Sequence, residues 1–189
     1  FDASPGPHGA CGLRGAAGDV MHPLVKLAKD TVELYIREGK IREVREEELT
    51  SELKQRAGVF VCLKIDGTLR GCIGTFQPEE PTIAHETVRN AISAATCDPR
   101  FTCVRTDELD AIEYTVDVLT PPEPVKDRSE LDPRRYGVIV QAGGRRGLLL
   151  PDLDGVDTVD FQISIAMQKA GIPLGTPVSL FRFEVKRYQ

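Results

Sequence analysis

The residues best suited to chemistry lie in one short stretch. Residues 69–74 read Leu-Arg-Gly-Cys-Ile-Gly and follow an apolar run across the turn pair Asp66-Gly67. Strand alternation places Arg70 and Cys72 on one face, where a guanidinium favours the thiolate form of a cysteine. Glycine in a strand marks a bulge or the close approach of a ligand or another backbone. The stretch therefore predicts a site with Cys72 as the reactive group and Arg70, Gly71 and Gly74 as ligand contacts.

A structural interpretation of Cys72 stays open beside the chemical one. Free cysteine is among the most buried residue types and packs as a small hydrophobe. Hairpin register decides which partner it meets. A two-residue turn places Cys72 opposite Val61, on the side of Leu63 and Ile65, whereas a three-residue turn that includes Thr68 places it opposite Cys62. In the second register the two sulfurs can approach each other.

Arg100 is the second candidate cation for the site. It follows Asp98-Pro99, so its local frame is rigid. Two roles are open: an ion pair with Asp98 or a bond to a carbonyl, or an anion contact facing the same cleft as Arg70. A cysteine nucleophile needs a base within hydrogen-bond reach. His22 and His85 are the candidates outside the N-terminal segment. His22 fits a helix entry. His85 either reaches Cys72 from the start of the helix that follows the hairpin or lies on a solvated helix surface.

A second charged stretch lies further along the chain. Residues 143–147 read Gly-Gly-Arg-Arg-Gly, and we expect them to form the tip of a hairpin over residues 137–150. The stretch is not a P-loop, because the chain contains no GxxxxGK[ST] sequence. Its arginines are either solvated or bind phosphate or the carboxylates of a partner. The cysteines form no CxxC pair, and neither a metal nor a cofactor is expected.

Composition narrows the class of protein. The 189 residues fit one domain, or two lobes that share a core. A net charge of −5 disfavours non-specific binding to nucleic acid. Five cysteines, an odd number, and the absence of a secretory segment indicate a reduced, cytoplasmic protein. Residues 1–21 carry glycine at every third position over part of their length and are predicted to be a flexible leader or linker, ahead of a single domain over residues 22–189.

Strands and helices are intermixed in the pattern of apolar residues. Helical spacing and capping residues predict helices, and alternation with turn pairs predicts strands. The expected helices cover residues 24–38, 46–56, 81–96 and 158–170, and the expected strands cover 59–76 as a hairpin, 112–119, 137–150 as a second hairpin, and 178–187. Two hairpins imply antiparallel pairing, so the fold class is α+β.

The chain resembles the AMMECR domain family, whose bacterial members are called protein A of the AmmeMemoRadiSam system. Residues 69–74 match its signature. Asp-Pro-Arg-Phe at 98–101, the strand at 112–119, Arg-Gly-Leu-Leu-Leu-Pro at 146–151 and Lys-Ala-Gly at 169–171 follow in the family's order. The resemblance spans about Pro23 to Tyr188. Residues 152–168 lack the aromatic-rich segment that many relatives carry.

The resemblance implies a two-lobed α+β fold. The larger lobe has a mostly antiparallel sheet flanked by helices, and the signature lies at or near a cleft beside the smaller lobe. It also implies two partners, a Memo-type protein and a radical SAM protein. It supplies no established activity.

Two hypotheses of different class follow. In the first, the protein is a cleft-bearing binding or accessory component that acts with these partners. In the second, it is an enzyme that uses Cys72 as a reactive thiol on a small anionic substrate. A nucleic-acid-associated factor is a third option, which the net charge disfavours.

Overall fold

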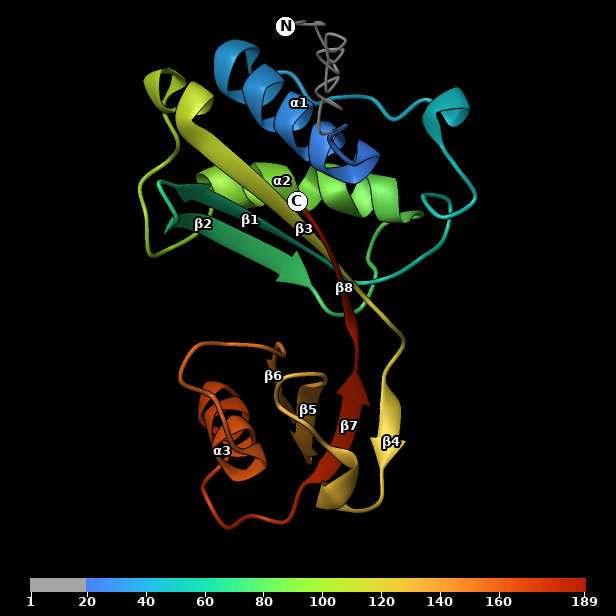
Figure 1. The fold of residues 1–189 in the computed structure, drawn as a ribbon, viewed down its shortest axis with the longest axis vertical. Helices are drawn as coiled ribbons and strands as arrows, with labels where there is room; N and C mark the ends of the chain where they lie inside the picture. Colours follow the sequence, from blue (N-terminus) through green and yellow to red (C-terminus); the bar gives the residue numbers. More distant parts are fainter. Residues whose placement is uncertain (1–19) are drawn as a thin grey trace, which may run out of the picture.

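Two four-stranded antiparallel sheets, each covered by helix on one face, form two lobes (Figure 1). The computed structural model describes residues 20–189, so the predicted leader over residues 1–21 lies almost wholly outside the described residues. The α+β class and the two-lobed architecture are confirmed. Within the described residues, no helix has the length and apolar character required to cross a bilayer.

The larger lobe contains both long helices. Its sheet has the strand order β2-β1-β3-β8, and α1 and α2 cover the face that turns away from the smaller lobe (Figure 1). Pro at the first turn of α1 and a left-handed Gly39 at its end set the limits of that helix. The elements are α1 (Pro23–Glu38), β1 (Val59–Ile65), β2 (Thr68–Thr75), α2 (Ile83–Thr96), β3 (Ile112–Leu119) and β8 (Val185–Tyr188), with short 3₁₀ helices η1 (Glu46–Glu48) and η2 (Thr106–Ala111).

The smaller lobe repeats the arrangement with one helix. Its sheet has the order β4-β7-β5-β6, and α3 packs on β5 and β6. Thr158 caps the start of α3 by accepting a hydrogen bond from the Phe161 amide. The elements are β4 (Glu123–Val125), β5 (Gly137–Ala142), β6 (Arg145–Leu149), α3 (Val159–Lys169) and β7 (Ser179–Phe183), with the 3₁₀ helix η3 (Arg128–Glu130).

The chain passes between the lobes at two adjacent points. The predicted closing strand over residues 178–187 divides at Glu184: β7 pairs in the smaller sheet and β8 in the larger one. The connector from β3 to β4 runs beside it, where the Thr120 amide donates to the Glu184 carbonyl and the Glu184 amide donates to Thr120 Oγ1. This paired crossing joins the two sheets.

Two further expected elements differ from the structure. The helix predicted over residues 46–56 is wrong: only Glu46–Glu48 are helical, followed by turns. Glu46, Glu47 and Glu48 are exposed and Leu53 is the one buried residue there, so the segment has no continuous apolar face to stabilise a helix. The five-residue hairpin tip is also wrong. Gly143 and Gly144 alone make the turn, and Arg145, Arg146 and Gly147 belong to β6.

Each lobe has its own apolar core. In the larger lobe, Val59, Val61 and Leu63 of β1 point toward α1 and α2 and are fully buried. In the smaller lobe, Val138 and Val140 of β5 pack against Ile163 and other residues of α3. Strand alternation then turns the intervening residues of β1 toward the opposite face, where the smaller lobe lies.

Candidate functional site: the cleft between the lobes

A cleft of about 790 Å³ separates the free face of the larger sheet from the smaller lobe. Cys62 and Cys72 form part of its floor, and residues 146–149 of β6 with the following Leu150 form part of the opposite wall. The volume lies in the range of small-molecule sites. Its charged lining residues are Lys64, Arg100, Asp117, Arg146, Asp152, Asp154, Lys169 and Arg187, and its other side chains come from Phe60, Leu69, Phe76, Thr115, Leu148, Leu149, Leu150, Leu153 and Gln189.

The register of the first hairpin combines features of both predicted alternatives. Asp66 and Gly67 form a two-residue turn with positive φ at both positions, as a type I′ turn requires. A β-bulge then leaves Arg70 without a partner, and the register shifts by one residue. Cys62 therefore lies opposite Cys72, with their Cα atoms 4.1 Å apart.

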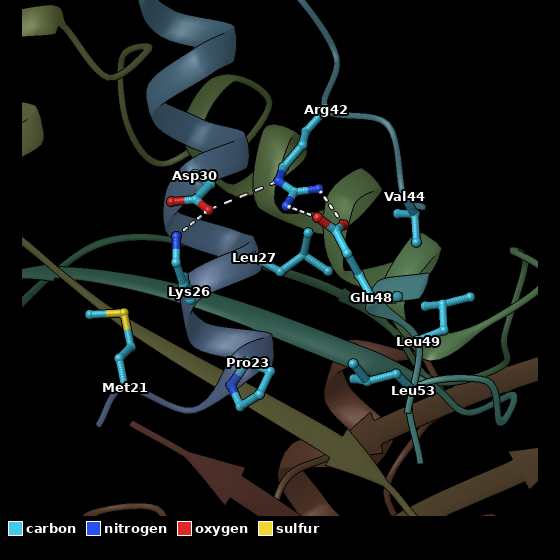
Figure 2. Close-up of a pocket in the computed structure, with 11 residues that line it drawn as sticks. Met21, Pro23, Lys26, Leu27, Asp30, Arg42, Val44, Glu48, Leu49 and Leu53 are labelled. Carbon is cyan, nitrogen blue, oxygen red and sulfur yellow. Dashed lines mark hydrogen bonds and ion pairs between the residues drawn. The ribbon is translucent and has the colours of Figure 1, made fainter. Parts of the chain in front are cut away.

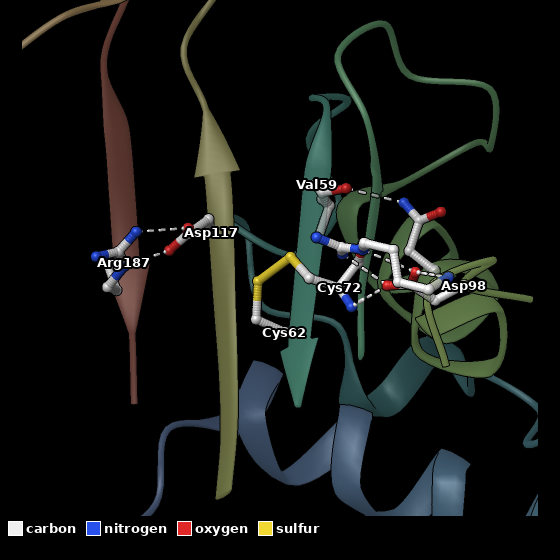
Figure 3. The surroundings of a disulfide bond; sticks show 8 residues. Val59, Cys62, Cys72, Asp98, Asp117 and Arg187 are labelled. Atoms are coloured by element: carbon white, nitrogen blue, oxygen red, sulfur yellow. Dashed lines mark hydrogen bonds and ion pairs between the residues drawn. A yellow bond between two sulfur atoms is a disulfide. The ribbon is translucent and has the colours of Figure 1, made fainter. Parts of the chain in front are cut away.

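The two cysteines are joined in a disulfide that lines the cleft (Figure 3). This corrects the expectation that the cysteines are all reduced; Cys97 and Cys103 are free and exposed. A nucleophilic role for Cys72 stays a prediction, and it requires that the disulfide first be opened.

The bulge also changes the direction of Arg70. The expectation that Arg70 and Cys72 share a face is wrong, because Leu69, rather than Arg70, lines the cleft with Cys72. Arg70 makes a bidentate ion pair with Glu108, at 2.8 and 3.0 Å, and donates to the carbonyls of Thr102 and Cys103. The guanidinium holds the pKa of Glu108 below its ordinary value. Arg70 thus fastens β2 to the segment after α2, and a ligand contact for it stays a prediction.

Asp98 and Arg100 close the outer edge of β2. The Cys72 amide donates to Asp98 Oδ2 at 2.9 Å (Figure 3). Arg100 donates to the Cys72 carbonyl at 3.3 Å. Arg100 also bonds both oxygens of Asp98, whose side chain is 2% exposed. These bonds hold the pKa of Asp98 well below its ordinary value. Arg100 fills the predicted pairing role and, with more than half of its side chain exposed, also lines the cleft.

Internal packing accounts for both glycines of the signature. A Cβ atom on Gly71 would lie closer than 3.0 Å to the Ala94 carbonyl of α2, so this glycine lets the helix approach the strand. A Cβ atom on Gly74 would collide with the ring of Phe60 on the adjacent strand. Both glycines are explained without a ligand, so ligand contact at Gly71 or Gly74 stays a prediction.

Arg187 and Asp117 add a second ion pair to the cleft floor. Both Asp117 oxygens accept from Arg187, at 2.8 and 2.9 Å, on the neighbouring strands β3 and β8 (Figure 3). Asp117 is buried, and both residues line the cleft. Sequence reasoning missed this pair, because residues 70 positions apart give no local signal of their pairing.

Arg146 differs from the other arginines of the cleft. Among residues 20–189, no carboxylate forms an ion pair with it, and its Nε atom is buried with no hydrogen-bond partner. Two aromatic rings contact its guanidinium, Phe76 at 5.1 Å and Phe181 at 5.6 Å. The rings stabilise the cation without neutralising it. Because the Gly143-Gly144 turn is only two residues long, Arg146 belongs to strand β6. From that strand its side chain lines the cleft.

A separate hollow of about 250 Å³ lies between α1 and residues 42–53 (Figure 2). The charged side chains that line this hollow form ion pairs with one another. Lys26 pairs with Asp30, and Arg42 pairs with Glu48. The Nε atom of Arg42 also lies 4.0 Å from Asp30 Oδ2. No charged group in it is left to attract a ligand, so the interlobe cleft is the stronger candidate.

Neither candidate base lies in the cleft lining. His22 caps α1 through Nδ1 and stacks on Tyr188, and burial lowers its pKa, which agrees with the helix-entry role. His85 contacts Thr82 in the first turn of α2 and lines a different hollow beside Arg89. Within the described residues, no cluster of His, Cys, Asp and Glu side chains has the arrangement of a metal site.

The fold defines a two-lobed α+β protein in which an arginine-glycine hairpin from each lobe lines one interlobe cleft. The chain belongs to the AMMECR1 family, whose family model matches residues 25–189. The predicted family membership is confirmed.

Relatives from bacteria and archaea agree with this assignment. A Thermotoga maritima protein is 56% identical over 170 residues, which is 89% of this chain and 98% of the relative. Protein CA_C1420 of Clostridium acetobutylicum is 46% identical over 168 residues, and the match spans 88% of this chain but 36% of that longer protein. The crystal structure of the uncharacterized protein PH0010 from Pyrococcus horikoshii superposes with a TM-score of 0.78 at 32% identity, covering 87% of this chain and 88% of that one.

Proposed function

We propose that this protein is a binding component that holds a small anionic ligand in the cleft between its lobes, with Arg146 as the principal anion contact. The observation that carries the proposal is the guanidinium of Arg146, which lacks a carboxylate partner among the described residues and lines the cleft. An unpaired cation at a partly dehydrated site attracts an anion more strongly than one in open water.

The other cleft arginines are already neutralised and play a different part. Asp98 pairs with Arg100 and Asp117 with Arg187, so each of these cations is fixed in position. An arginine held in place loses less freedom when it binds a ligand. We infer that Arg146 supplies the main attraction and that Arg100 and Arg187 orient the ligand through donors their carboxylates leave unused.

The apolar lining narrows the ligand class. Phe60, Phe76 and Leu148 lie beside the charged groups, which suits a compact molecule with an acidic head, carboxylate or phosphate, and an apolar part. Arginine binds both head groups in bidentate fashion.

Isothermal titration with phenyl phosphate tests the ligand class. We expect saturable binding to the wild-type protein and at least about tenfold weaker binding to Arg146→Met, the loss of one charge-assisted contact. Arg145→Met is the matched control: Arg145 neighbours Arg146 on β6 but is exposed and donates to the Gly171 carbonyl. Equal loss in both variants, or no binding by the wild type, would contradict the proposal.

The same cleft is the surface we propose for assembly with a Memo-type protein and a radical SAM protein, a setting that family resemblance suggests. Filling the cleft with Leu148→Trp should abolish co-purification with the Memo-type protein, whereas Cys72→Ser should leave it intact. Co-purification that survives Leu148→Trp would place the docking surface elsewhere.

A further inference from the structure

The disulfide on the cleft floor is poorly suited to a purely structural role. A disulfide stabilises a protein mainly by restricting the unfolded chain, and the effect grows with the length of the loop it closes. Cys62 and Cys72 are only 10 residues apart in one hairpin, whose strands are already paired on both sides of them. Both half-cystines are partly exposed and line the cleft, whereas the core side of β1 is fully buried.

The surroundings of the pair allow the disulfide to open without rearrangement of the hairpin. Hydrogen bonds with Asp98 and Arg100 hold the backbone of Cys72 at the outer edge of β2. Gly71 is fixed under the Ala94 carbonyl, and Arg70 is fastened to Glu108. These contacts do not involve the sulfur atoms, so they persist in the dithiol state and keep the two thiols opposite each other.

We propose that Cys62 and Cys72 are a reversible dithiol–disulfide couple that exchanges with small thiols bearing an acidic group. The exchange itself needs only the disulfide; the choice of an acidic thiol rests on the proposed function, because Arg146 lines the same cleft. This assigns to the cleft an activity, thiol–disulfide exchange, in addition to binding.

The reaction consumes two molecules of the small thiol. The thiolate of the first attacks one cystine sulfur, the S–S bond breaks, and its electron pair leaves on the other cysteine, which gives a mixed disulfide and a protein thiolate. The second thiolate attacks the small-molecule sulfur of the mixed disulfide and expels the remaining cysteine. The products are the small-molecule disulfide, which is the oxidised species, and the protein dithiol, whose thiolates take up protons according to their pKa.

Two thiols of nearly equal shape test the proposal: 3-mercaptopropionate and its neutral methyl ester. The folded, oxidised full chain is treated with each at equal thiolate concentration, quenched with acid and alkylated, and the peptides that contain Cys62 and Cys72 are quantified by mass spectrometry. The free, exposed Cys97 and Cys103 serve as internal references for complete alkylation.

We expect both thiols to reduce the disulfide in the folded protein, with the acid about fivefold faster at low ionic strength. The preference should vanish in Arg146→Met, persist in Arg145→Met and shrink in high salt. Treatment of the reduced protein with 3,3′-dithiodipropionate should restore the disulfide.

The failures of the two proposals are distinguishable. A disulfide that is reduced only after unfolding in urea, or a dithiol that dithiodipropionate does not oxidise, overturns the exchange, while the titration with phenyl phosphate still tests ligand binding. If the acid and its ester reduce the disulfide at equal rates, the dithiol–disulfide couple is supported. The proposal that Arg146 attracts the acidic group of the thiol is then overturned.

Discussion

The two lobes present the same local pattern and use it differently. In each, a hairpin turn is followed by an arginine and a glycine: Arg70-Gly71 after Asp66-Gly67, and Arg146-Gly147 after Gly143-Gly144. In each, the glycine lies under a helix carbonyl, Ala94 in the larger lobe and Ala166 in the smaller one. Arg70 is itself the unpaired bulge residue, so the first hairpin has one more residue between its turn and its glycine, and Leu69 occupies the paired position that Arg146 holds in the second hairpin.

The arginines differ in their partners. Arg70 donates hydrogen bonds to Glu108 and to two carbonyls, all within its own lobe. Arg146 instead contacts two aromatic rings, one from each lobe, and has no carboxylate partner among residues 20–189. The first guanidinium therefore serves the fold, and the second is available to a ligand. Sequence pattern places an arginine, but the anions around it decide its role.

The largest expected effect tests what the hairpins share. Gly71→Ala and Gly147→Ala each introduce a Cβ atom closer than 3.0 Å to a helix carbonyl oxygen, so strand and helix must separate. We expect each change to reduce the free energy of unfolding by about 3 kcal/mol or more, measured by urea denaturation.

Gly144→Ala is the control for this pair. Gly144 lies in the second hairpin, but a Cβ atom there meets no neighbour within 4 Å, so its stability should remain within about 0.5 kcal/mol of the wild type. If Gly147→Ala is equally mild, then β6 and α3 are less tightly packed than β2 and α2, and the equivalence of the two hairpins does not hold.

The next effect separates the two arginines. Arg70→Met removes a bidentate, charge-assisted pair and two carbonyl bonds and leaves Glu108, 22% exposed, without its cation. We expect a loss of about 2–3 kcal/mol in the free energy of unfolding. Arg146→Met removes only contacts with rings and should cost under about 1 kcal/mol. Chemical denaturation of both variants, beside the ligand titration, gives the comparison.

The reverse order of effects would contradict our assignment of roles. If Arg146→Met destabilises the protein as much as Arg70→Met does, then Arg146 is a structural tie between the lobes. Its missing carboxylate would then no longer indicate a ligand site.

The sequence predicted those elements whose signals are local. Helices α1 and α2 follow from apolar spacing, with Gly39 marking the end of α1 and Pro81 the start of α2, and the first turn follows from Asp66-Gly67. The same kind of signal gave a wrong prediction at residues 46–56. The charged residues there are compatible with a helix, but Glu46–Glu48 have no buried side chain that would stabilise one.

The site needed contacts that no local pattern encodes. The bulge at Arg70 is tied to Glu108, 38 residues away, and it alone brings Cys72 opposite Cys62. The environment of Arg146 requires Phe76 from one lobe and Phe181 from the other. The signature stretch could therefore be recognised from the sequence, but the roles of its arginine and cysteine depended on tertiary structure.

The smallest expected effect distinguishes the hairpins by pH. Asp98 and Glu108 both hold the first hairpin, and hydrogen bonds from Arg100 and Arg70 lower their pKa values below the ordinary 3.8 and 4.5. A lowered pKa in the folded state gives stability that is complete at neutral pH. As the pH falls below about 4.5, the unfolded chain binds protons first, and that stability is progressively lost.

Acid should therefore loosen β2 before β6. The ladder between β5 and β6 contains no carboxylate, so its protection should change little, by under about 1 kcal/mol, between neutral pH and about pH 3.5. Protection of β2 should fall by about 1–2 kcal/mol, measured by peptide-resolved hydrogen exchange corrected for intrinsic rates. Asp98→Asn removes one titrating group, so it should lower protection of β2 at neutral pH and reduce the further loss in acid. Equal acid sensitivity of both hairpins would mean that charges elsewhere control unfolding and that the carboxylates at β2 are incidental to it. A selective loss at β2 would show that the first arginine and its neighbours form a structural ion-pair network, which is the role that Arg146 does not share.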